Sequence, residues 1–190
     1  MSTLSPTTDD ASTHSMVYHK KLVFYVNSER QELDNPDPTM LLVDYLRSTD
    51  IGLTGTKHSC GQGGCGACTV TLSHYDEHKK DVVHVAGNSC LRPVCSLDGM
   101  QVTTVEGIGS VNTEISPVQY QLAKCNGSQC GYCTPGFVMA SKGFLDKHPH
   151  PTYEDVKHGL GGNLCRCGTY VGVRQAVLEA AKNMKGASRG

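Results

Sequence analysis

The chain has 190 residues, a length that favours one domain or two small ones. Lys and Arg number 17 and Asp and Glu 18, and the formal net charge of −1 gives no electrostatic reason to expect nucleic acid or an anionic membrane as a partner. Only 38% of the residues are hydrophobic, and no run approaches the roughly 20 apolar residues of a transmembrane helix, so we expect no membrane span. Residues 1–15 lack the basic and apolar regions of a secretory signal, so a cytoplasmic location is expected, with export alongside a partner left open.

The first part of the chain is predicted to be a small α+β unit that follows a mobile tail of residues 1–18. The predicted strands are residues 21–26, a second strand ending near Leu33, and residues 68–72, 82–85 and 101–105. Thr39 is predicted to cap a helix after the second strand. The predicted buried face of this helix consists of Leu42, Val43 and Leu46. Asp44 and Tyr45 are expected to point away from that face.

After Gly109 the pattern changes to helices. Ser116-Pro117 and Thr134-Pro135 each have the form of an N-cap followed by proline, and Thr152 is predicted to cap a third helix. A fourth helix is predicted over residues 170–184. Four short helices in this length suggest a compact bundle, in which two helical hairpins form a pseudo-symmetric pair.

Glycine and cysteine have the two unusual counts, 21 and 10 residues. Ten cysteines without an export signal argue against a disulfide scaffold and for metal binding. The first group consists of Cys60, Cys65, Cys68, Cys90 and Cys95. The second group consists of Cys125, Cys130, Cys133, Cys165 and Cys167. Two separate groups suggest two metal sites in two domains.

Cys60, Cys65 and Cys68, with Cys90 further along, have the spacing of plant-type [2Fe-2S] proteins. Three thiolates must wrap a small cluster from one short segment, so the chain has to curl tightly. The glycines that would permit this are Gly61, Gly63, Gly64 and Gly66. Exposed N–H groups in such a loop can point at the sulfurs and stabilise an anionic cluster. Spacing and glycine content favour a cluster over zinc, while the choice between Cys90 and Cys95 as fourth ligand stays open.

Cys130-x2-Cys133 and Cys165-x-Cys167 offer four further thiolates as two pairs, each on a Gly-containing loop beside a predicted helix start. Helix N-termini favour anionic groups, so two such ends could hold a thiolate-ligated cluster. Spacing alone leaves a four-thiolate zinc site open here, and a thioredoxin-like dithiol is weaker because no βαβ pattern surrounds it. Cys125 is expected in the core. The nine histidines, of which only His58 adjoins a cysteine loop, are expected in solvated or locally hydrogen-bonded positions.

Five stretches carry a resemblance to a known family. They are residues 60–70, which read CGQGGCGACTV, and residues 90–96, 102–108, 127–136 and 162–167. In this order they resemble the iron–sulfur part of the xanthine oxidase (molybdenum hydroxylase) family, over about residues 20–183. The length is similar to that of the separate small iron–sulfur subunit of bacterial members rather than to the large fused animal enzymes.

The resemblance implies an α+β fold with two cluster-binding domains. Residues 19–106 would form a β-grasp, plant ferredoxin-like domain, and residues 107–190 an all-α four-helix bundle with pseudo-twofold symmetry. The implied ligands of the first [2Fe-2S] cluster are Cys60, Cys65, Cys68 and Cys90. The implied ligands of the second are Cys130, Cys133, Cys165 and Cys167, which removes zinc. The positions of Gln129 and Cys167 are those at which the family contacts the pterin of the molybdenum cofactor.

The implied function is an electron-transfer subunit with no substrate-binding active site of its own, and we assign no catalytic residue. Its partner would be a large subunit that holds the molybdopterin cofactor and oxidises an aldehyde or N-heterocycle. Gly168-Thr169 stands where much of the family has the reverse order, as in the isoquinoline oxidoreductase type. Members of that type tend to lack a flavin subunit, so an FAD subunit is in doubt and a cytochrome or other acceptor is expected. A free-standing two-cluster carrier and a zinc-stabilised interaction module are the alternatives.

Overall fold

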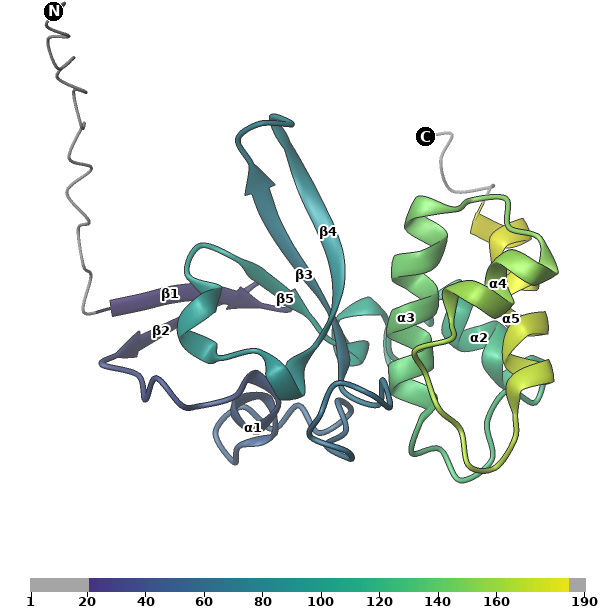
Figure 1. Ribbon diagram of the computed structural model, residues 1–190, viewed down its shortest axis with the longest axis horizontal. Coiled ribbons are helices and arrows are strands. Elements are labelled where there is room, and N and C mark those ends of the chain that lie inside the picture. Colours follow the sequence, from purple (N-terminus) through teal and green to yellow (C-terminus); the bar gives the residue numbers. More distant parts are fainter. Residues whose placement is uncertain (1–20, 185–190) are drawn as a thin grey trace, which may run out of the picture.

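The computed structural model describes residues 21–184, so the tail predicted for residues 1–18 lies outside the described residues. A sheet with one short α-helix lies beside a group of four α-helices (Figure 1). The strands are β1 (Lys21–Val26), β2 (Glu29–Asp34), β3 (Thr69–Asp76), β4 (Asp81–Asn88) and β5 (Gln101–Thr103). The α-helices are α1 (Leu42–Arg47), α2 (Pro117–Lys124), α3 (Thr134–Lys147), α4 (Tyr153–Gly159) and α5 (Tyr170–Met184). Three 3-10 helices are η1 (Ser89–Leu91), η2 (Val94–Leu97) and η3 (Val105–Ile108).

The five strands form one sheet in the order β2-β1-β5-β3-β4. β1 pairs with β5 in parallel, and the other neighbours are antiparallel. β1 and β2 form a hairpin, and Asn27 and Ser28 form its two-residue turn with positive φ angles of 49° and 72°. β3 and β4 form a longer hairpin that projects beyond the rest of the sheet (Figure 1).

Helix α1 closes the core on one face of the sheet, and here two predictions were wrong. Tyr45 is 8% exposed instead of facing solvent, because it lies one turn after Leu42 and so shares its face. Its ring packs 5.4 Å from that of Phe24, measured between centroids. Thr39 does not cap α1, which begins at Leu42 without a side-chain cap. The Thr39 N–H and hydroxyl donate instead to Asp37, at 2.8 and 2.7 Å.

The four remaining α-helices pack around a second core, which includes Phe137, Val173 and Val177. Ser116 caps α2 and Thr152 caps α4, as predicted, and each cap is part of a capping box. The predicted cap of α3 was wrong, because Cys133 holds the N-cap position without a side-chain bond. Among residues 21–184, no helix is both long and apolar enough to cross a membrane.

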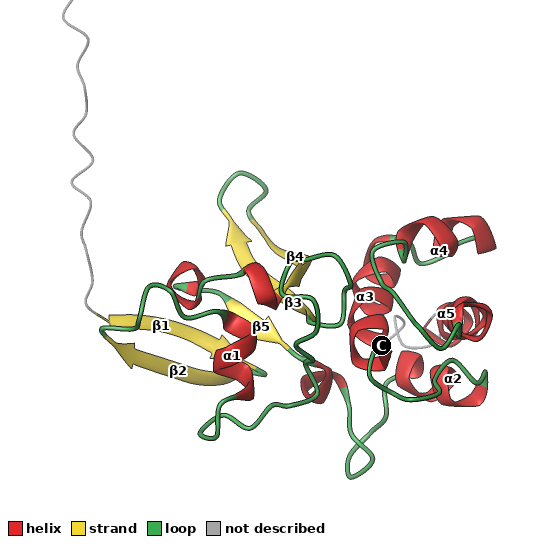
Figure 2. Cartoon of the chain, turned by 60° about the horizontal axis from the view of Figure 1, so that its bottom comes forward, coloured by secondary structure: helices red, strands yellow, loops and turns green. Residues whose placement is uncertain are grey.

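Helix α3 lies between the sheet and the other helices (Figure 2). Its first turn touches the cysteine loop that precedes β3. A Cβ atom added at Gly136 would lie 2.2 Å from the Gly66 carbonyl oxygen, whereas one added at Gly143 would lie 3.4 Å from the Ala86 side chain. The close approach therefore depends on glycine at the start of α3 and not further along it.

We expect Gly136→Ala to lower the free energy of unfolding by about 1–3 kcal/mol, because the added methyl group must displace either α3 or the Gly66 carbonyl. Gly143→Ala on the same helix is the matched control. It should be neutral or stabilising by up to about 1 kcal/mol, because alanine is the better helix former and only ordinary contact results. Denaturant unfolding of both variants measures the difference, and equal effects would contradict this account of the contact.

Candidate metal centres

The loop that carries Cys60, Cys65 and Cys68 curls as predicted. Gly61, Gly63 and Gly66 have φ angles of 66°, 71° and 71°, the left-handed region in which only glycine is free of strain. Gly64 was also predicted to need such an angle, but its φ angle is not positive. The curled loop brings its three cysteines to one end of the sheet, where β3 begins.

Backbone N–H groups of this loop point at the Cys60 sulfur. The Gln62 N–H donates to Cys60 Sγ at 3.4 Å. Together with the N–H groups of Cys65 and Gly64, it lowers the pKa of Cys60 to about 6. The thiolate is the form that binds metal, so these N–H groups favour the metal-binding form of an exposed cysteine.

Cys90 lies beside Cys68, and both are buried. Burial first, and then the Cys68 thiol, raises the pKa of Cys90 to about 11. Ser89 fastens the two segments together, because its N–H and hydroxyl both donate to the Cys68 carbonyl, at 3.2 and 2.8 Å. Cys95 is exposed on η2, with its sulfur about 4 Å from the carbonyls of residues 36 and 37. The structure thus places Cys90 with the loop cysteines and Cys95 elsewhere.

The second group of thiols forms where two loops meet before α3 and α5. The Cys130 thiol interacts with that of Cys167, and the Cys133 thiol with that of Cys165. Burial raises the pKa of Cys133 to about 12. Burial also opposes ionisation of Cys165, but the Thr169 hydroxyl at 3.1 Å and the Thr169 N–H outweigh it and lower the pKa of Cys165 to about 7. Each pair therefore joins one cysteine from each loop.

The thiols at both sites are arranged as pairs rather than around one point. Within residues 21–184, no three His, Cys, Asp or Glu side chains gather closely enough to hold a single metal ion. A [2Fe-2S] cluster takes four cysteines, two at each iron, so paired thiols fit it. A cavity of 430 Å³ bordered by Cys65, Cys130, Cys133 and Cys165 offers room beside the second group.

The other predicted site residue, Gln129, is exposed, as are its neighbour Cys130 and the facing Cys167. These three residues therefore share an accessible edge of the second group. Cys125 packs against the helical core, as expected. His58 is locally bonded, as expected, with Nδ1 3.2 Å from an Asp44 carboxylate oxygen.

Direct hydrogen bonds join the loops that carry the two groups of cysteines. Sequence reasoning missed the residues that make these bonds. The Leu164 N–H donates to the Cys65 carbonyl at 2.9 Å. The Tyr132 hydroxyl donates to the His58 carbonyl at 2.5 Å, and the Asn163 amide donates to the Gly66 carbonyl at 3.0 Å. Their positions beside cysteines were the only signal, because no local pattern shows a contact between segments so distant in sequence.

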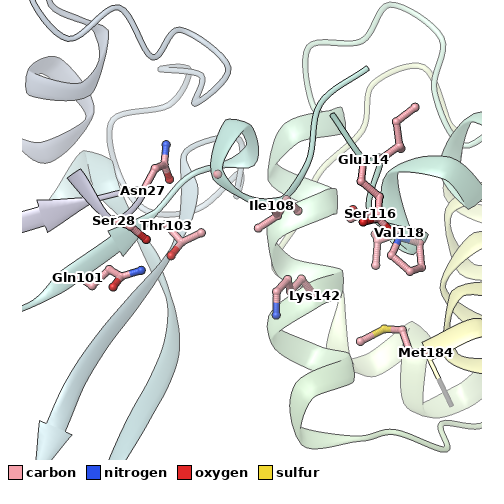
Figure 3. Close-up of a pocket in the computed structure, with 13 residues that line it drawn as sticks. Asn27, Ser28, Gln101, Thr103, Ile108, Glu114, Ser116, Val118, Lys142 and Met184 are labelled. Atoms are coloured by element: carbon pink, nitrogen blue, oxygen red, sulfur yellow. The ribbon is translucent and has the colours of Figure 1, made fainter. Parts of the chain in front are cut away.

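A cavity of 460 Å³ between the two parts of the molecule is not part of either site. Figure 3 shows Gln101 and Thr103 of β5 facing Lys142 of α3 across it. None of the described residues that line it is a cysteine or histidine.

Two family models match the chain in succession. The model described as "2Fe-2S iron-sulfur cluster binding domain" matches residues 24–95, and the one described as "[2Fe-2S] binding domain" matches residues 104–178. The sheet and the helical part thus correspond to two successive iron–sulfur domains. The chain is a two-domain [2Fe-2S] protein of mixed α and β structure.

Sequence relatives connect the chain to a family. Aldehyde oxidase 4 of Cavia porcellus is 52% identical over 162 residues, which are 85% of this chain and 12% of that protein. Xanthine dehydrogenase/oxidase of Felis catus is 48% identical over 163 residues, 86% of this chain and 12% of that protein. The chain is therefore similar to the iron–sulfur part of xanthine oxidase family proteins, and it spans 12% of the length of these relatives.

Solved structures show the same arrangement. Quinoline 2-oxidoreductase from Pseudomonas putida 86 has a TM-score of 0.75 and 28% identity, and the match covers 90% of this chain and 98% of that chain. The aldehyde oxidoreductase from Desulfovibrio gigas has a TM-score of 0.74 and 37% identity, over 89% of this chain and 18% of that chain. A sheet with a short helix beside four α-helices therefore also occurs in these two solved oxidoreductase structures.

The contrast between Cys90 and Cys95 gives a direct test of ligand choice. We expect Cys90→Ser to remove the first cluster, with loss of about half of the iron, because its sulfur lies with the loop thiols. Cys95→Ser, on the neighbouring 3-10 helix, should keep both clusters. Iron analysis and electron paramagnetic resonance of the two variants check this. If Cys95→Ser lost a cluster while Cys90→Ser kept both, Cys95 and not Cys90 would be the fourth ligand.

Proposed function

We propose that this chain is the iron–sulfur electron-transfer subunit of a molybdenum-containing hydroxylase. It would take electrons from a molybdenum cofactor in a partner subunit and pass them through two [2Fe-2S] clusters to an external acceptor, during oxidative hydroxylation of an aldehyde or N-heterocycle. Residues 19–106 would be the β-grasp domain and residues 107–190 the four-helix bundle. The observation that carries this proposal is the direct backbone hydrogen bond between the two cysteine-bearing loops, from the Leu164 N–H to the Cys65 carbonyl.

The proposed ligands follow the thiol pairs. Cys60 and Cys65 would hold one iron of the first cluster, and Cys68 and Cys90 the other. The proposed pairs at the second cluster are Cys130 with Cys167 and Cys133 with Cys165. When bound, such a cluster accepts and releases one electron at a time, with a potential that depends on hydrogen bonds to its sulfurs.

The chain's own residues would hold the two centres at a short and fixed separation. Cys65 is a proposed ligand of the first cluster, and its carbonyl accepts from the residue directly before Cys165, a proposed ligand of the second. One hydrogen bond and a few covalent bonds therefore connect the two ligand sets. The N–H groups around Cys60 would stabilise the negative charge of the first cluster, and Thr169 that near the second.

The surface beside the second group supports a tight complex over a free-standing carrier. Tyr132, Leu164 and Val171 are exposed by 48%, 57% and 71% although they are large and apolar. Apolar side chains that gather at one edge are typical of an interface core. We place the molybdenum subunit at this edge, where Gln129 and Cys167 are accessible for contact with the pterin.

A separate subunit is supported by one match. The match covers 98% of the quinoline 2-oxidoreductase chain, so a chain of about this extent is a separate polypeptide in that structure. The acceptor would approach the first cluster, near the exposed Cys60. We propose a cytochrome or another acceptor there, with a flavin subunit as the less favoured arrangement. Size-exclusion chromatography of the native protein, with sequencing of co-purifying chains, distinguishes a complex from a monomeric carrier.

Purified protein should contain about four iron atoms and four acid-labile sulfides per chain. The reason is that eight cysteines form two sites, each made of two thiol pairs. Reduction should produce two distinguishable rhombic signals in electron paramagnetic resonance. Chemical analysis and spectroscopy of protein from its native source make the measurement. Stoichiometric zinc without iron would refute the proposed function.

We expect Gln129→Ala to leave both clusters and the complex intact, because the side chain is exposed and lies beside the proposed ligands rather than among them. Loss of an amide that hydrogen-bonds the pterin should slow substrate-driven cluster reduction or lower cofactor retention. Rapid-reduction kinetics and molybdenum content test this. Exposed Gln175→Ala on α5 is a matched control and should behave like wild type.

A further inference from the structure

The Gly66 carbonyl is one of the points at which the two domains are in contact. Gly66 is buried directly after Cys65, with a φ angle of 71°. Its carbonyl oxygen accepts two side-chain hydrogen bonds. The Thr69 hydroxyl donates from the same domain at 2.7 Å, and the Asn163 amide donates from the helical domain at 3.0 Å. The same oxygen therefore accepts one side-chain hydrogen bond from within the first domain and one from the helical domain.

Asn163 and Leu164 act together as a clamp. The Asn163 side chain bonds the Gly66 carbonyl while the next backbone N–H, that of Leu164, bonds the preceding Cys65 carbonyl at 2.9 Å. Asn163 is 7% exposed, and its own N–H is fixed to the Leu160 carbonyl at 3.1 Å. Two consecutive donors therefore bind two consecutive acceptors, which fixes both the distance and the orientation of the loops.

The backbone around this contact is packed too closely to admit an added methyl group. A Cβ atom at Gly66 would lie 2.4 Å from the Asn163 amide nitrogen and 2.7 Å from the Gly162 carbonyl oxygen. On the other side, the first turn of α3 leaves no room for a methyl group at Gly136. The Gly66 peptide is therefore enclosed between α3 and the loop that carries Cys165. Movement of one domain away from the other at this point would lengthen the Asn163 bond.

We propose that Asn163 is a positioning residue for electron transfer between the two clusters. Its amide holds the loop of the first cluster against the loop of the second, and so sets the separation across which the electron must pass. This inference rests on the proposed function. Asn163 binds neither cluster, and it acts through the Cys65-Gly66 backbone.

Asn163→Asp and Asn163→Ala test the proposal in the cluster-loaded protein. The aspartate keeps the shape but removes the amide donor and places a carboxylate oxygen against the Gly66 carbonyl. The alanine removes the bond without burying a charge, so it covers the case in which Asn163→Asp fails to fold. Thr69→Val is the matched control, because it removes the other side-chain hydrogen bond to the same carbonyl from within one domain and leaves the Thr69 N–H bond at 3.3 Å.

Two measurements separate positioning from simple stability. The first is the magnetic dipolar interaction between the two reduced clusters, which depends on their distance. The second is cleavage by a glutamate-specific protease at the exposed Glu114, in the segment between η3 and α2. We expect the Asn163 variants to keep iron, sulfide and each cluster's own signal, to show a weaker dipolar interaction, and to be cleaved on the order of tenfold faster. Thr69→Val should keep the interaction and the slow cleavage.

The result that overturns the proposal is an unchanged dipolar interaction in both Asn163 variants, with protease resistance as in wild type. A weaker interaction in Thr69→Val as well as in the Asn163 variants would also overturn it, because the effect would then belong to the loop and not to the bond between domains. If the wild-type protein holds no two clusters, the proposed function fails first. If it holds both and the variants leave their interaction intact, only the role of Asn163 falls.

Discussion

Two consecutive peptide carbonyls, those of Cys65 and Gly66, carry the contact on which the arrangement of the two domains depends. Both point out of a loop that glycine has bent into left-handed conformations, and both are taken up by donors from the helical domain. A loop without those conformations would turn its carbonyls elsewhere, and the domains would lose their shared hydrogen bonds. The glycines thus serve the thiols on one side of the loop and the domain contact on the other.

The thiols themselves are held in contrasting surroundings. N–H groups lower the pKa of the exposed Cys60 to about 6, whereas burial raises that of Cys90 to about 11 and that of Cys133 to about 12. The protein alone therefore stabilises the thiolate at some ligand positions and opposes it at others. Metal binding must supply the free energy that ionises the buried thiols, which ties the final packing of these loops to cluster insertion.

Most elements follow from local pattern, because strand alternation, helical spacing and the caps at Ser116 and Thr152 are encoded within a few residues. The errors came from local alternatives that the pattern did not weigh. Tyr45 lies one turn after Leu42 on the buried face of α1, where it packs against Phe24. Thr134 is no cap because its hydroxyl pairs with that of Ser128 at 2.7 Å. The thiol groups were visible from spacing, but Asn163 was not, because its partner lies 97 residues away.

The middle position of β5 in the sheet has a consequence for synthesis. β5 is a strand of three residues that lies between β1 and β3, and it leaves the ribosome after the other four strands. Until it is made, the two hairpins have no strand to join them, so the nascent chain carries two separate ribbons with their apolar faces uncovered. The loop cysteines emerge during that interval. The fold therefore cannot shield these thiols from oxidation before the sheet closes.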